Sequence, residues 1–122
     1  MKTSDKLAEI LNFLHQCSVD YNYFYDKVNE EDKLTQDILH KIELGNLKYE
    51  ERAKLATVLQ TNRKDRRFYK DKAEELAPLA DFMNKTETQK TINILKNVLG
   101  EVRKAEKSHE NRVYTPRTKK VI

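Results

Sequence analysis

The feature that most constrains the fold is a stripe of residues spaced alternately three and four positions apart between Leu7 and Ile42. The stripe is apolar except at Glu31 and Thr35, and it comprises Leu7, Ile10, Leu14, Cys17, Tyr21, Phe24, Val28, Glu31, Thr35, Ile38 and Ile42. This is the a/d spacing of a coiled-coil seam. Because no Gly or Pro occurs before Gly45, the stripe predicts one helix over residues 4–44, about 60 Å long. Such a helix needs the rest of the chain to cover its stripe.

A second stripe, over residues 48–83, predicts a helix that folds back on the first. Gly45 suits the left-handed position that ends a helix, and the short connection after it implies an antiparallel neighbour. A register in which paired residue numbers sum to about 93 places Phe24 opposite Tyr69 and Ile38 opposite Leu55. The polar break also meets a polar break, which we expect to be a layer of Glu31, Asn62 and Arg66. Pro78 predicts either a kink near residues 74–78 or a break followed by a short segment to Met83.

A third helix is predicted over residues 87–111. Its stripe comprises Ile92, Leu95, Val98, Leu99, Val102 and Ala105. The short connection before it predicts packing near the Pro78 end of the hairpin. The expected fold is all-α: a long antiparallel helical hairpin with a third helix, forming a three-helix, coiled-coil-like bundle. Residues 1–111 would make a single domain, followed by a basic flexible tail over residues 112–122.

Composition narrows the function classes. Charged residues make up 36% of the chain and there is one cysteine, Cys17. We expect Cys17 to be a buried, inert thiol at the seam. The sequence shows no glycine-rich phosphate loop and no nucleophile elbow. His15 and Cys17 lie two positions apart on the helix and cannot chelate one metal together. We therefore expect no enzyme activity, no catalytic residue, no metal and no cofactor. The absence of a signal peptide or an apolar span predicts a cytoplasmic protein without a membrane partner.

Charge is distributed unevenly along the chain. Residues 1–61 contain eight Lys/Arg and eleven Asp/Glu, whereas residues 62–122 contain sixteen and nine. Arg63, Arg67 and Lys70 fall on one helical face of the basic stretch 62–72. This basic face has three possible interpretations. The acidic residues opposite it in the hairpin neutralise it, or it binds an acidic partner protein, or it binds nucleic acid. The tail, with Arg117, Lys119 and Lys120, is either a solubilising end or an additional binding arm.

Two further groups are candidate partner-binding surfaces. If the third helix covers only the Pro78 end, the hairpin tip keeps an open apolar patch made of Leu34, Ile38, Ile42, Leu55 and Leu59, with Arg52 at its rim. Such a patch predicts either a homodimer or a docked partner protein. The other group is the aromatic run of residues 21–25. Tyr23 and Tyr25 cannot both face the seam. One is expected to contact the third helix and the other to be exposed, where a tyrosine near basic residues is a candidate binding residue.

Two segments give the chain a recognisable character. Residues 62–71 (NRKDRRFYKD) and 104–112 (KAEKSHENR) are dense in charges of both signs, and the first segment also contains Phe68 and Tyr69. In this the chain resembles small charged helical proteins of bacteriophages and prophages of low-GC Gram-positive bacteria. The resemblance implies a host-cell cytoplasmic setting and a non-enzymatic protein that binds, and modulates or inhibits, a host protein. The alternatives are a nucleic-acid-binding accessory protein and a virion assembly or scaffold component.

Overall fold

The computed structural model describes residues 1–114, 116–118 and 120. These residues form three helices and no strand: α1 spans Thr3–Leu44, α2 spans Tyr49–Asn84 and α3 spans Thr86–Glu110. The all-α class is confirmed, and each predicted helix end lies within one residue of the observed end. The chain divides into two compact units. The hairpin unit is Leu14–Lys85, and the terminal unit combines Met1–Phe13 with Thr86–Ile122.

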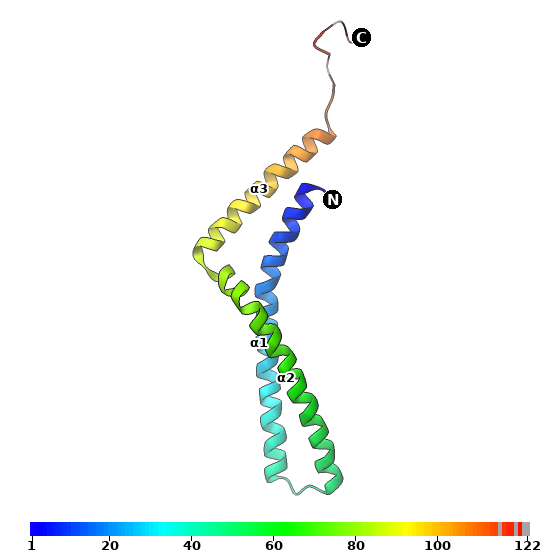
Figure 1. Ribbon diagram of the computed structural model, residues 1–122, viewed down its shortest axis with the longest axis vertical. Helices are drawn as coiled ribbons and strands as arrows, with labels where there is room; N and C mark the ends of the chain where they lie inside the picture. Colours follow the sequence, from blue (N-terminus) through cyan, green and yellow to red (C-terminus); the bar gives the residue numbers. More distant parts are fainter. Residues whose placement is uncertain (115, 119, 121–122) are drawn as a thin grey trace. The chain divides into compact units, whose positions relative to one another are not determined.

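In the hairpin unit, α2 runs back along α1 from a tip at residues 45–48 (Figure 1). The predicted register is confirmed at two points. The Asn62 side-chain amide donates to the Glu31 carboxylate at 2.7 Å, and the ring centroids of Phe24 and Tyr69 lie 6.2 Å apart. Both pairs have residue numbers that sum to 93. The seam therefore sets the alignment of the two helices, as its polar and apolar pattern predicts.

Gly45 ends α1 in a different way from the one predicted. Neither glycine has a positive φ, so the left-handed cap is wrong. Instead, the Gly45 N–H donates to the Lys41 carbonyl at 2.9 Å. A Cβ at this position would lie 2.5 Å from the same oxygen. Glycine is needed here because there is no room for a side chain, not because of its torsional freedom.

Pro78 does not break α2, which continues to Asn84. Figure 1 shows the helix axis changing direction in its last turns. A proline removes one N–H from the helical hydrogen-bond ladder and crowds the preceding turn, which accounts for a bend without an interruption. Cys17 is buried at 2% exposure, as the seam predicts.

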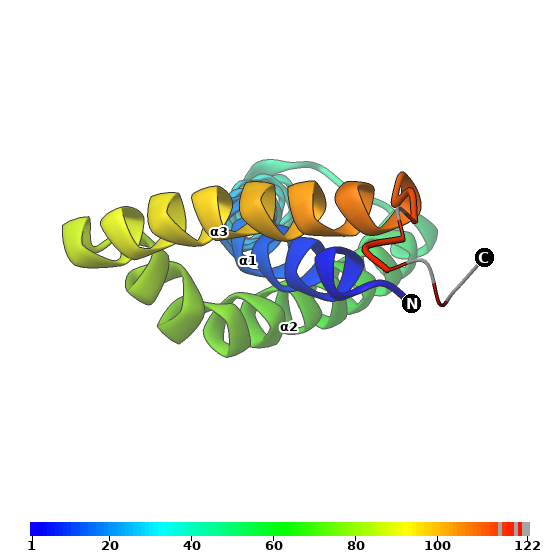
Figure 2. The same ribbon diagram turned by 90° about the horizontal axis from the view of Figure 1, so that it is seen from above.

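In the terminal unit, the start of α1 lies beside the end of α3, and the two segments run in opposite directions (Figures 1 and 2). The Lys2 ammonium pairs with the Glu110 carboxylate at 2.9 Å, and the Ser4 N–H donates to Glu106 Oε2 at 3.2 Å. A carboxylate of α3 therefore takes up a free N–H at the start of α1, where the helix dipole favours negative charge. The buried residues of this unit are Ser4, Leu11, Thr88, Ile92 and Leu99.

Some details of the stripe change in the terminal unit. The seam predicts Ile10 to be buried, but Ile10 is 55% exposed and Leu11 is 9% exposed. The reason is that Met1–Phe13 packs on α3, so the buried positions of α1 are those on the side of α3. On α3, Ile92 and Leu99 are buried as predicted, whereas Val98 is 43% exposed.

Candidate interaction surface of the hairpin

A buried polar layer fixes the middle of the hairpin. The Asn62 side chain is 2% exposed, and its amide nitrogen donates to the Glu31 carbonyl at 2.9 Å and to the Glu31 carboxylate at 2.7 Å. Its amide oxygen accepts the Thr35 hydroxyl at 2.6 Å. The predicted layer of Glu31, Asn62 and Arg66 is confirmed for Glu31 and Asn62 but is wrong for Arg66. Arg66 Nε donates instead to Asp32 Oδ1, because both residues point to one side of the seam.

On that same side the hairpin carries a hollow of about 240 Å³, which we call the tyrosine hollow. It is lined by Tyr21, Tyr25, Val28, Arg66, Lys70, Ala73, Glu74 and Ala77. The residues from α1 are spaced four and three apart, and those from α2 follow the same spacing along a facing row, so each set shares one helical face. The lining combines the small side chains of Ala73 and Ala77 with the large rings of Tyr21 and Tyr25. The difference in size leaves the hollow open.

The side chains of Tyr23 and Tyr25 lie on different faces of α1. Tyr25 is 53% exposed and its ring centroid lies 6.1 Å from that of Tyr21 at the hollow. Tyr23 is 52% exposed and its ring contacts Phe24 at 5.3 Å, with the Lys27 ammonium 5.5 Å from its centroid. Two positions on a helix differ by about 200°, which explains this separation. Neither ring faces the seam.

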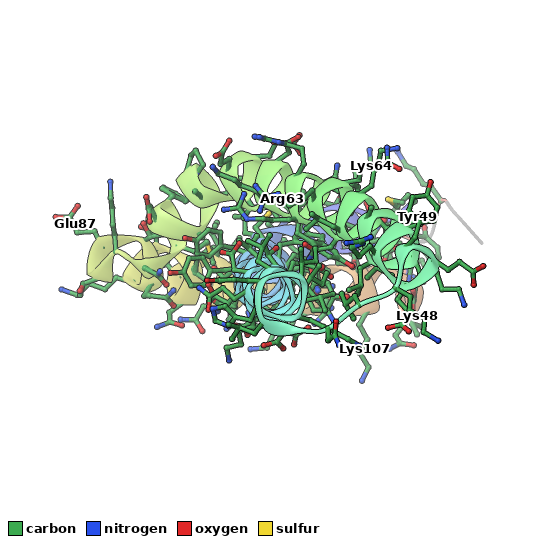
Figure 3. The ribbon with its side chains drawn as sticks, turned by 90° about the horizontal axis from the view of Figure 1, so that it is seen from below. Lys48, Tyr49, Arg63, Lys64, Glu87 and Lys107 are labelled. Atoms are coloured by element: carbon green, nitrogen blue, oxygen red, sulfur yellow. The ribbon has the colours of Figure 1, made fainter. Side chains whose placement is uncertain are left out.

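A basic surface adjoins the hollow. A shallow depression of about 420 Å³ is lined by Gln60, Arg63, Lys64, Arg66 and Arg67. Arg66 lines both features. Figure 3, which looks onto the hairpin tip, shows Lys48 and Tyr49 at the tip and Lys64 on the side of α2 away from α1.

Most cations of this surface form no ion pair with the described residues. Within the part of the chain that the structure describes, Arg63, Lys64, Arg67 and Lys70 form no ion pair. Neutralisation by the facing helix is therefore limited to Arg66 with Asp32. Glu30, which the register places near this stretch, pairs with Lys27 instead. The interpretation that the hairpin neutralises its own basic patch is wrong for Arg63, Arg67 and Lys70.

The predicted patch at the hairpin tip is divided by the structure. Leu34 and Ile42 are each 40% exposed, Leu55 and Leu59 are half-buried, and Arg52 is exposed. Ile38, however, is 4% exposed, so its place in an open patch is wrong. In the observed register Ile38 lies opposite Leu55, whereas Ile42 lies opposite Glu51, which supplies no apolar cover. The two helices close this part of the seam without a third.

The tail residues belong to the terminal unit. Arg117 and Lys120 are exposed, and Lys119 lies outside the described residues.

The pKa values that are shifted among the described residues belong to groups in surface pairs. The pKa of Glu106 is lowered, first by the Ser4 hydroxyl and then by the Ser4 N–H and the charges of Lys2 and Arg103. The pKa of Lys2 is raised by its hydrogen bond to Glu110, and that of Lys27 by Glu30.

The described residues show neither a metal site nor a membrane-spanning helix. They contain no group of three or more His, Cys, Asp or Glu side chains placed to hold a metal ion. No described helix combines the length and the apolar character needed to cross a bilayer. The sequence pattern points to Arg63, Arg67 and Lys70 but misses the tyrosine hollow. The available signal was the pair of alanines that the register places near Tyr21.

The tyrosine hollow and the basic surface together form the most distinctive surface of the hairpin unit. It combines large aromatic side chains, a recess and unpaired cations. This composition is typical of surfaces that bind other macromolecules. Comparison with known proteins adds no relative: no family model matches the chain, and neither a curated protein nor a solved structure matches it.

Proposed function

We propose that this is a non-enzymatic protein-binding protein that docks a partner protein on its hairpin unit. The observation that carries the proposal is the tyrosine hollow beside unpaired arginines. Tyr and Arg are enriched among the residues that dominate binding energy at protein interfaces. The hollow, at about 240 Å³, is smaller than the roughly 300–1,000 Å³ of small-molecule sites. It suits one inserted side chain better than a metabolite or a cofactor.

The resemblance to small phage proteins supplies a setting for this activity. A small helical protein with one binding surface and no catalytic group acts by occupying a surface of its partner. In a host cell, occupation of that kind modulates or inhibits the partner. The modulator role is therefore part of the proposal, with a host protein as the partner.

Site-specific photocrosslinking tests the proposal. A photoreactive phenylalanine analogue replaces Tyr25 at the hollow, and in a control chain it replaces Tyr23. The two positions match in residue type and in exposure, at 53% and 52%. We expect nuclease-resistant adducts of increased mass from position 25 in the cells that make the protein, and none from position 23. Equal adducts from both positions, or none from either, would overturn the proposal.

Nucleic-acid binding is the second candidate, because Arg63, Lys64 and Arg67 form no ion pair with any described residue and Phe68 beside them is 53% exposed. Single strands are held by such combinations of cations and aromatic faces. However, the Phe68 ring already contacts Phe24 and Tyr69 at 6.4 and 5.6 Å, and the Lys72 ammonium lies 5.9 Å from its centroid. This candidate predicts strongly salt-dependent binding to nonspecific DNA or RNA. It also predicts nuclease-sensitive adducts in the crosslinking experiment.

A further inference from the structure

We infer that the partner contributes an acidic segment with one bulky apolar side chain. That side chain enters the tyrosine hollow, and the neighbouring carboxylates pair with Arg63, Arg67 and Lys70. The inference rests on the proposed function and names the chemistry of the partner at the same surface. Its two parts, the anchor and the charges, follow from separate observations.

The anchor follows from the size and lining of the hollow. About 240 Å³ is bounded by the rings of Tyr21 and Tyr25 and by the side chains of Val28, Ala73 and Ala77. Burial of one Leu, Phe or Trp side chain in such a recess strengthens binding by about tenfold to a hundredfold. A recess of this kind, surrounded by polar groups, is the usual position of an interface anchor.

The charge of the partner follows from a row on α2. Arg63, Arg67, Lys70 and Glu74 are spaced four, three and four positions apart and therefore lie along one helical face. The three cations of the row form no ion pair among the described residues. Arg66, which separates the basic depression from the hollow, is already neutralised by Asp32. An acidic segment laid over residues 63–70 would therefore find three cations that no described carboxylate already pairs.

Glu74 makes the two ends of the row differ in charge. It lines the hollow at the end of the row that is distant from Arg63. A carboxylate there repels a chain of uniform negative charge, such as a phosphate backbone. A peptide can instead place its acidic residues over the cations and a neutral or basic residue at Glu74. This difference favours an acidic protein segment over nucleic acid.

Fluorescence anisotropy with synthetic peptides tests the inference on the full chain. The probe is a short labelled peptide of Glu and Ser residues with one central Trp. The two comparison peptides replace the Trp by Ala, or every Glu by Gln. We expect the probe to bind at low salt and each comparison peptide to bind at least about tenfold more weakly.

Variants of the chain separate the two parts of the inference. Ala77→Phe fills the hollow and should weaken the Trp peptide by about tenfold while leaving the Ala peptide unchanged. Arg67→Glu should weaken both acidic peptides, and Arg52→Glu, the same charge change at the exposed tip, should weaken neither. If circular dichroism shows that Ala77→Phe is unfolded, Tyr25→Ala at the exposed rim replaces it. Its control is Tyr23→Ala.

Several outcomes would overturn the inference. Equal binding of the Gln peptide would remove the charge argument, and equal binding of the Ala peptide would remove the anchor. Displacement of the probe by oligothymidine at the same concentration would assign the surface to nucleic acid. Light scattering that shows a dimer abolished by Tyr25→Ala would assign the hollow to a second copy of the chain. If Tyr25 crosslinks to protein but no acidic peptide binds, the inference fails while the proposed function stands.

Discussion

Replacing Asn62 by alanine should remove the hydrogen bonds that fix the hairpin register and destabilise the protein by about 4 kcal/mol. Asn62 is 2% exposed and makes three hydrogen bonds, to the Glu31 carbonyl, the Glu31 carboxylate and the Thr35 hydroxyl. A neutral hydrogen bond contributes about 0.5–1.5 kcal/mol net, and one to a charged group contributes about 1.5–3 kcal/mol. At the middle of each range, two bonds of the first kind and one of the second give a sum of about 4 kcal/mol.

Urea denaturation followed by far-UV circular dichroism measures the free energy of unfolding. The matched control is Gln60→Ala, two positions away on α2 and exposed, which should change stability by less than about 0.5 kcal/mol. The informative comparison is the triple variant Glu31→Leu, Thr35→Val, Asn62→Leu. It removes all the side-chain partners together, so it should be about as stable as the natural chain. Its helices should, however, lose their single alignment.

Engineered cysteine pairs report that alignment in a Cys17→Ala background. Phe24→Cys with Tyr69→Cys samples the observed register, and Phe24→Cys with Leu76→Cys samples a slip of one heptad. We expect the second pair to form a disulfide only in the triple variant. A loss below about 1 kcal/mol in Asn62→Ala, or a triple variant as unstable as Asn62→Ala, would refute the reasoning.

Three further substitutions test other parts of the structure. Gly45→Ala should destabilise the hairpin, because its Cβ would lie 2.5 Å from the Lys41 carbonyl oxygen. Gly100→Ala should instead stabilise the protein by about 1 kcal/mol, because nothing lies within 4 Å of the added Cβ. Thermal melts measure both effects. Ile38→Ala, at 4% exposure, should cost about 2–5 kcal/mol and Ile42→Ala, at 40%, less than about 1 kcal/mol; equal losses would misplace the seam. Because the pKa of Glu106 is lowered from 4.5, its carboxylate stabilises the terminal unit above pH 4.5 and this stabilisation is lost as pH falls through the lower folded pKa. The protection factors of the amides at the start of α1, which correct for the intrinsic pH dependence of hydrogen exchange, should therefore fall on acidification in the natural chain but not in Glu106→Gln.

The hairpin could be predicted from sequence because two stripes agree in only one register. Glu31 opposite Asn62 was part of that agreement, since an unmatched polar residue on either helix would have been buried without a partner. The exclusive partner of Arg66 could not be predicted. Asp32 and Glu31 are adjacent in sequence, and the choice between them depends on which side of the seam the guanidinium occupies.

The candidate site was predicted only in part. Arg63, Arg67 and Lys70 stand out as a basic row, but their lack of internal partners depends on side-chain contacts of the facing helix. The tyrosine hollow arises from a difference in size between its tyrosine and alanine side chains. A pattern that only classes residues as polar or apolar contains no information on side-chain size. Ile38 was misassigned for a related reason. A seam position next to a hairpin tip can be closed by its direct partner alone, without a covering helix.

The terminal unit is made from the two ends of the described chain, and this has a consequence for the order of folding. Its contacts join residues 102 and 108 positions apart, whereas the polar layer of the hairpin joins residues 27 and 31 positions apart. Closing the longer loops first would cost more chain entropy. We therefore expect the hairpin to form before the terminal unit, which shortens the loop that must close before Lys2 can pair with Glu110. Pulse-labelled hydrogen exchange would register this as earlier protection of the amides in α2 than of the Ser4 amide.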